Sequence, residues 1–135
     1  MLPPFNERGN LPSGIYEVSW NEFCDRFGFN SHRQKILVGL ETALKLLAQA
    51  NCQRVYIGGS FVTSKNYPND FDGCYDDMNI DDNVLDPIFD EELIEQQKIF
   101  GGELLANPFF QGFLQTDRDG NPRRIIALNP QELIK

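Results

Sequence analysis

Apolar residues at helical spacing mark the longest regular stretch of the chain. Between residues 31 and 50 they recur every three or four positions, which predicts a helix with one buried face. These apolar residues are Ile36, Leu37, Leu40, Ala43, Leu44 and Leu47. A shorter helix is predicted just before them, because Ser19 and Glu22 have the spacing of a capping box and Gly28 follows as a stop signal.

Shorter apolar runs predict strands. The candidate strands are residues 54–57, 70–75 and 103–105. A helical turn is expected after the first of them, at residues 61–64. A helix is expected over residues 90–100, because its first three residues are acidic and favour a helix N-terminus. The residues between 76 and 86 are acidic and polar and are expected to form a loop.

The two ends of the chain carry different patterns. Residues 1–15 are rich in Pro, Gly and Asn and predict an extended arm, which apolar residues 2–5 would pack onto the body. Residues 113–116 and 124–128 flank an Asp-Gly turn, so they predict a β-hairpin. Residues 131–135 are expected to form a short tail. Together the elements predict an α/β (α+β) fold, a small mixed β-sheet flanked by helices, in one domain of residues 1–135.

Composition narrows the class of protein. The chain has 135 residues, and 20 acidic against 12 basic residues give a net charge of −8. This balance favours solubility and argues against a broad nucleic-acid-binding surface, which would be basic. No apolar run is long enough for a transmembrane helix, and residues 1–8 lack the pattern of a signal peptide, so no membrane partner is expected. Three widely spaced cysteines, Cys24, Cys52 and Cys74, indicate reduced thiols and a cytoplasmic location.

The candidate chemistry lies between residues 58 and 72. Glycines at 58 and 59 let the backbone approach a ligand closely, and the hydroxyl of Ser60 can donate to a phosphate oxygen. Asp70 and Asp72 would project from one face of a strand, where their charges repel each other. A divalent cation relieves that repulsion and can also bind phosphate. The turn and the carboxylates therefore complement each other.

Each of these signals also has a structural interpretation. The aspartates are also typical of a solvated loop, and Ser60 can cap a helix. An EF-hand is excluded, because Tyr75 stands where that loop needs glycine. Lys65 either contacts a triphosphate or is an ordinary surface lysine. For His32 we expect a surface or capping role, for the cysteines a place in the core, and for the acidic run 76–92 a solvated face. Arg123 and Arg124 are candidates for contact with an acidic partner.

The spacing of these motifs resembles that of the DNA polymerase beta-like nucleotidyltransferase superfamily. Its signature is a hydrophobic residue, Gly, then Gly or Ser, nine to thirteen residues, and Asp-hydrophobic-Asp/Glu-hydrophobic. Here Gly59-Ser60 is followed by nine residues and Asp70-Phe71-Asp72, although Gly73 replaces the last hydrophobic residue. The match covers residues 55–73. The chain's size resembles the minimal nucleotidyltransferases, and residues 2–6 with 60–64 resemble a small uncharacterised bacterial family within that group.

The resemblance implies a nucleotidyltransferase fold and a transferase activity. A nucleoside monophosphate would move from an NTP, such as ATP, onto a hydroxyl of a protein or RNA. Asp70 and Asp72 would hold Mg²⁺ or Mn²⁺, and Gly58, Gly59, Ser60 and Lys65 would bind the nucleotide. Glu103 is the best match to the superfamily's third carboxylate, as a metal ligand and catalytic residue; the alternative is a surface strand residue.

Two functions remain open on these grounds. Some minimal nucleotidyltransferases act as antitoxins, so a cognate toxin is one expected partner. The alternative is a catalytically degenerate fold that acts as antitoxin or scaffold by contact alone, which the departure at Gly73 favours. The geometry of Glu103 relative to Asp70 and Asp72 discriminates between the two. The sequence leaves the oligomeric state open.

Overall fold

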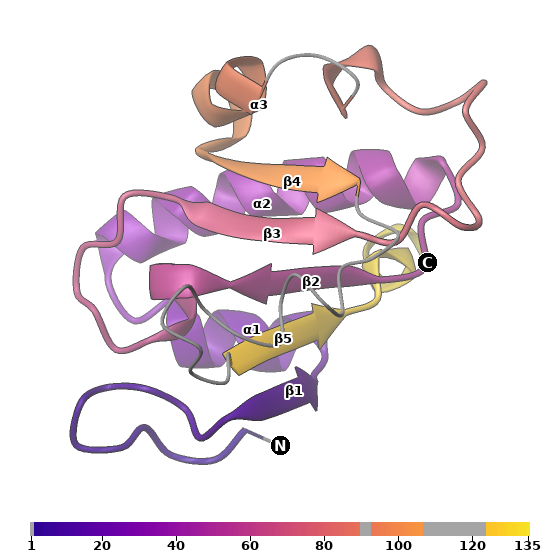
Figure 1. Cartoon of the computed structure of the whole chain (residues 1–135). Helices are drawn as coiled ribbons and strands as arrows, with labels where there is room; N and C mark the ends of the chain where they lie inside the picture. The colour runs from indigo at the N-terminus through magenta and orange to yellow at the C-terminus, as the bar shows by residue number, and fades with distance from the viewer. Residues whose placement is uncertain (1, 90–92, 107–123) are drawn as a thin grey trace.

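A five-stranded mixed sheet forms the centre of the protein (Figure 1). The computed structural model describes residues 2–89, 93–106 and 124–135. Within them the strand order is β1-β5-β2-β3-β4. The strands are β1 (Gly14–Glu17), β2 (Val55–Gly58), β3 (Phe71–Tyr75), β4 (Gly102–Ala106) and β5 (Arg124–Leu128). The pairs β1–β5 and β3–β4 are parallel, whereas β2 runs antiparallel to both β5 and β3. The predicted mixed α/β class is therefore confirmed.

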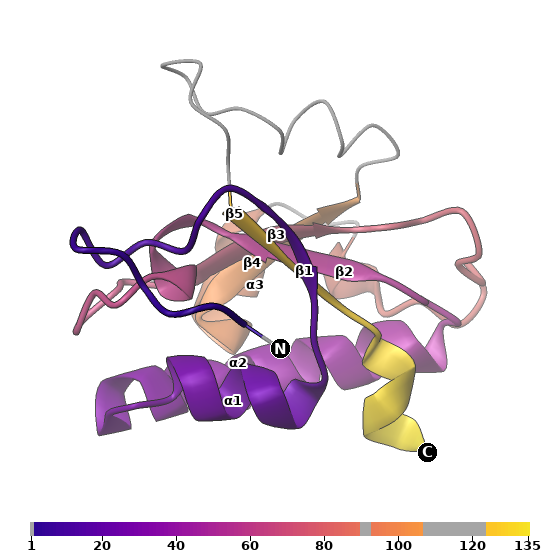
Figure 2. The same ribbon diagram turned by 90° about the horizontal axis from the view of Figure 1, so that it is seen from below.

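Helices cover one face of this sheet (Figure 2). They are α1 (Trp20–Phe27), α2 (Ser31–Gln49) and α3 (Leu93–Phe100), with short 3-10 turns η1 (Gly59–Val62), η2 (Pro87–Phe89) and η3 (Pro130–Ile134). The core lies between helices and sheet and includes the fully buried Phe23, Phe27, Leu40, Leu44, Ile57, Phe61 and Leu104. Tyr56, Cys74, Ile125 and Ala127 form a second buried cluster. No helix in the described ranges is long and apolar enough to cross a membrane.

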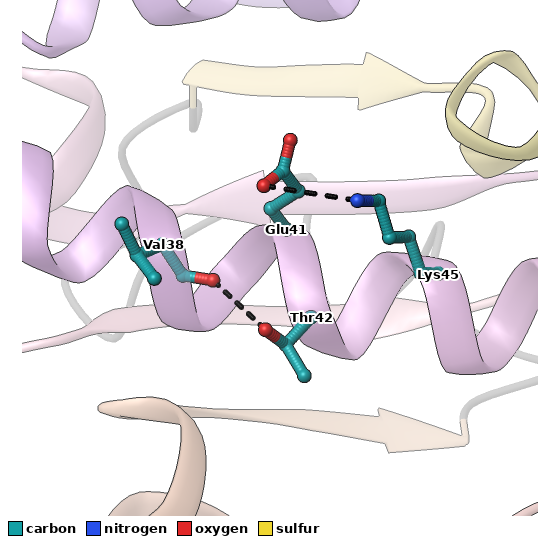
Figure 3. A network of polar contacts seen from close by, with 4 residues as sticks. All are labelled: Val38, Glu41, Thr42 and Lys45. Atoms are coloured by element: carbon teal, nitrogen blue, oxygen red, sulfur yellow. Dashed lines mark hydrogen bonds and ion pairs between the residues drawn. The ribbon is translucent and has the colours of Figure 1, made fainter.

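Local signals account for α1 and α2. Ser19 caps α1 by accepting a hydrogen bond from the backbone N–H of Glu22 at 3.1 Å, as the capping-box spacing predicted. On its solvent face, α2 has polar contacts between residues one helical turn apart (Figure 3). The ammonium of Lys45 lies 4.0 Å from the carboxylate of Glu41, and Thr42 Oγ1 donates to the carbonyl of Val38 at 3.1 Å. The apolar stripe between these positions is buried, so periodicity correctly predicted which face packs.

Long-range contacts correct the prediction at both ends of the chain. The expected arm ends in a strand, because residues 14–17 pair with β5. The expected C-terminal tail is η3, whose Gln131 Nε2 donates to the carbonyls of Ala48 and Cys52, both at 2.9 Å. The two edges of β5 are occupied by β1 and β2, where we expected a hairpin with residues 113–116. Those residues and the 117–122 turn lie outside the described residues.

Candidate functional site

The turn after β2 lies directly beside Asp72. Gly58, the last residue of β2, is the register partner of Asp72 in β3. Gly59 has a φ of +73°, and a Cβ built on it would lie 3.9 Å from the Cβ of Asp72. Ser60 follows in η1 and is exposed. Within the described part of the chain the Ser60 hydroxyl makes no hydrogen bond, and Ser60 lines the cavity described below.

Asp72 and Glu103 lie side by side on neighbouring strands. They are register partners in the parallel pair β3–β4, so their side chains share one face of the sheet. Their neighbours Phe71 and Leu104 are buried in the helix-side core, which places the two carboxylates on the opposite face. Asp70 precedes β3, and its Oδ2 accepts a hydrogen bond from Gln97 Nε2 of α3 at 3.2 Å.

Mutual repulsion among these carboxylates affects Glu103. Partial burial raises the pKa of the Glu103 carboxyl above its usual value, and the negative charges of Asp72 and then Asp70 raise it further. Asp72 and Asp70 are thus each within electrostatic reach of Glu103. As they stand, no three acidic, histidine or cysteine side chains among the described residues are arranged to hold a metal ion. The donor set consists of hard carboxylate oxygens, which is the chemistry that Mg²⁺ prefers.

A cavity of about 380 Å³ opens between the turn and Asp72. This volume is within the range of roughly 300–1,000 Å³ typical of small-ligand sites. Its polar lining consists of Ser60, Thr63, Asp72, Arg124 and Asn10. Asn10 carried no signal in the sequence, and Arg124 was considered only as a contact for an acidic partner. Their chain positions are far from the Gly-Ser turn, so only the fold brings them to it.

Arg33 holds the segment behind the turn. It is fully buried, and its guanidinium donates to the carbonyls of Phe27 at 2.9 Å, Phe61 at 2.7 Å, Thr63 at 2.7 Å and Lys65 at 2.9 Å. Its Cζ also lies 4.8 Å from the ring centroid of Phe61. Burial lowers the pKa of Arg33 to about 10, so it stays cationic at neutral pH. Sequence reasoning missed it, because arginine is usually exposed.

The remaining candidates have structural roles or stay predictions. The Lys65 side chain is exposed and is not part of the described cavity lining, so its contact with a triphosphate stays a prediction. His32 Nε2 lies 2.6 Å from the carbonyl of Pro68. No disulfide joins Cys24, Cys52 and Cys74, and burial raises the pKa of Cys24 and Cys52 to about 11, which makes these two thiols unreactive.

Packing explains glycine at position 73. A Cβ there would lie 2.0 Å from the carbonyl oxygen of Tyr56 on β2. A hydrophobic side chain, which the superfamily pattern expects at this position, therefore does not fit without moving β2. The absence of a side chain is a consequence of strand packing one residue after Asp72.

One family model matches nearly the whole chain. It is described as a family of unknown function (DUF6932) and matches residues 3–129. The match includes every residue of the site, from Asn10 to Arg124. No curated protein and no solved structure matches the chain.

Proposed function

The chain belongs to the DUF6932 family of unknown function, and we propose that it is a magnesium-dependent nucleotidyltransferase. It would move a nucleoside monophosphate from an NTP onto a hydroxyl of a protein or RNA and release pyrophosphate. The observation that carries the proposal is that Asp72 has a register partner on each of the two strands beside β3. Its strand partners are Gly58, which leads into the Ser60 turn, and Glu103. The turn that carries Ser60 and the two carboxylates are thereby juxtaposed on three strands.

Each group has a role in this chemistry. The Ser60 hydroxyl and the backbone of the turn bind the β- and γ-phosphates, and Asp70 and Asp72, with Glu103 as third ligand, would hold Mg²⁺. Bound Mg²⁺ supplies neutralisation of the phosphate charge. The acceptor oxygen forms a bond to the α-phosphorus while the bond from that phosphorus to the bridging oxygen breaks. Pyrophosphate leaves with the bond's electron pair, and the acceptor's proton passes to an oxygen of the Glu103 carboxylate that does not bind the metal.

The way in which the acceptor is held is part of the proposal. The described residues form one sheet with its helices, and the cavity beside Ser60 opens on it. The acceptor would be held by a shallow face of this chain or by a partner protein. A cognate toxin, as the resemblance implies, is one acceptor of this kind, and it would give the protein an antitoxin-like role.

The test is nucleotide transfer from labelled NTPs. Incubation with labelled ATP, CTP, GTP or UTP, Mg²⁺ and cell extract should place label on a protein or RNA. Asp72→Asn should abolish the label, whereas Asp82→Asn, in an exposed loop, should retain it. Glu103→Gln should reduce transfer by roughly 10²-fold while NTP binding persists, a loss of about 2.7 kcal/mol in transition-state stabilisation.

Other outcomes contradict the proposal in distinct ways. A wild-type chain that binds Mg·NTP but labels nothing acts as a binding module instead. Transfer by Asp72→Asn at the wild-type rate would place the chemistry elsewhere in the chain. Transfer by Glu103→Gln at the wild-type rate would remove only the role of Glu103.

A further inference from the structure

Arg124 brings a positive charge to the cavity beside the Ser60 turn. It is the first residue of β5, and its Nε donates to the carbonyl of Leu11 at 2.9 Å. Of the described residues that line the cavity, Arg124 alone is cationic. It forms no ion pair within the described ranges. A guanidinium that lines a cavity is suited to a phosphate, which it can bind through two parallel N–H donors.

A turn of the N-terminal arm forms the neighbouring wall. Asn6 Oδ1 accepts hydrogen bonds from the backbone N–H groups of Arg8 at 2.9 Å and Asn10 at 3.0 Å, and Asn6 N donates to the carbonyl of Asn10 at 2.8 Å. These bonds close the turn with backbone atoms of Asn10, and Asn10 also lines the cavity. Leu11, the next residue, is fully buried and anchors the turn in the core.

Gly9 fastens this turn to the segment after η1. Its carbonyl accepts from the backbone N–H of Ser64 at 2.8 Å, and its φ is +80°. This φ favours glycine, and a Cβ on Gly9 would lie 2.0 Å from Ser64 Oγ, so the Ser64 hydroxyl would have to turn away. The arm is therefore hydrogen-bonded to the segment after η1, and it lines the same cavity as η1 and β5.

We propose that Arg124 and Asn10, positioned by the arm, bind the polyphosphate chain of the ligand together with Ser60. The identity of the ligand as an NTP rests on the proposed function, but an anion-binding wall needs no metal. Asp72 shares the cavity and repels a free anion. An anion that carries its own divalent cation, as Mg·NTP does, satisfies both the guanidinium and the carboxylate.

Titration calorimetry of the full chain with sodium tripolyphosphate in EDTA isolates this wall from the metal. Arg124→Gln should weaken binding tenfold or more, because it removes charge-assisted hydrogen bonds. Arg54→Gln makes the same change of charge and should bind as wild type, because Arg54 precedes the opposite end of β2 and pairs with Glu17. Asp72→Asn should bind tripolyphosphate more tightly, because a like charge is removed.

Asn10→Ala tests the wall without touching Arg124. The hydrogen bonds of Asn10 within the described residues use its backbone, so the variant should fold normally. It should weaken tripolyphosphate binding by a few-fold, whereas Asn83→Ala, in an exposed loop, should have no effect. Repeating the titration with Mg·ATP and Mg·tripolyphosphate separates a nucleotide ligand, which binds more tightly as ATP, from a free polyphosphate.

The proposal that Arg124 and Asn10 bind polyphosphate is overturned if wild type does not bind tripolyphosphate at millimolar concentration, or if Arg124→Gln binds it as tightly as wild type does. The experiments distinguish failure of this polyphosphate-binding proposal from failure of the proposed nucleotidyltransferase function. Asp72-dependent nucleotide transfer together with unchanged binding by Arg124→Gln would retain the function and exclude the wall. Arg124-dependent tripolyphosphate binding without any transfer would retain the wall and exclude the enzyme.

Discussion

Asp72 and Glu103 become a pair through strand register. Each follows a buried residue, Phe71 or Gly102, and its side chain points away from the helix-side core. In the parallel pair they face the same side in direct register, which brings two negative charges together. A like-charge pair of this kind is unfavourable for folding, so it is the residue-scale feature most in need of a functional reason.

Glu103→Gln is expected to stabilise the metal-free protein at neutral pH. The pKa of Glu103 is raised above its ordinary 4.5 in the folded protein, so the folded state binds more protons than the unfolded chain. The free energy of unfolding of wild type therefore falls as pH rises from the ordinary pKa through the raised one. Urea denaturation should show the variant as more stable at neutral pH and equal to wild type below about pH 4.

The matched control for this experiment is Glu7→Gln, an exposed glutamate in the arm. It makes the same chemical change away from the carboxylate pair and should leave the pH profile unchanged. A stability difference between wild type and Glu103→Gln that does not vary with pH would show that repulsion by Asp72 and Asp70 is not its cause.

At the element scale, η1 depends on α2. The turn itself is four residues long and too short to hold its own conformation. Arg33, in the first turn of α2, donates hydrogen bonds to the carbonyl of Phe61 in η1 and to those of Thr63 and Lys65 just after it. The buried guanidinium therefore preorganises the backbone on which Ser60 stands.

Arg33→Met is expected to lower the free energy of unfolding by at least about 3 kcal/mol. The variant retains most of the apolar stem but leaves buried carbonyls without donors, at a cost of about 1–3 kcal/mol each. Lys35→Met, an exposed position in the same turn, should change the stability by less than about 0.5 kcal/mol. Urea denaturation measures both, and a loss below about 1 kcal/mol for Arg33→Met would mean that the carbonyls find other partners.

At the scale of the whole molecule, charge links stability to metal. The chain carries a net charge of −8, and the charges of Asp72 and Asp70 both act on the Glu103 carboxyl. A cation that binds only the folded state stabilises it by mass action, by about 2.7 kcal/mol at a concentration of one hundred times Kd. Metal binding is therefore measurable as a shift in Tm without any assay of activity.

Mg²⁺ or Mn²⁺ is expected to raise the Tm of wild type by several degrees. Asp70→Asn/Asp72→Asn should abolish that rise, and it should also raise the Tm of the metal-free protein by removing repulsion. Asp77→Asn/Asp82→Asn, in the acidic loop, removes the same charge and should leave the metal-induced rise intact. Thermal unfolding with and without metal measures these shifts in Tm. An equal rise in wild type and in Asp70→Asn/Asp72→Asn would show that the metal binds elsewhere than at Asp70 and Asp72.

Local patterns determined much of this protein from the sequence alone. Helix periodicity, a capping box and short apolar runs predicted α1, α2, β2, β3 and β4 close to their observed bounds. The Gly-Ser turn and the aspartates after it were identified as the candidate site for the same reason. Such signals act between residues a few positions apart, so they can be recognised without the tertiary structure.

Only the tertiary structure decided which distant segments meet. The arm ends in β1 because residues 14–17 find a parallel partner in β5, and four residues carry too little alternation to predict that pairing. Arg124 and Leu11 are bonded across 113 positions. Arg33 is buried because four carbonyls from two segments converge on it, one at the end of α1 and three between residues 61 and 65. Strand register and buried polar contacts depend on the whole packed core, so no local window of residues contains them.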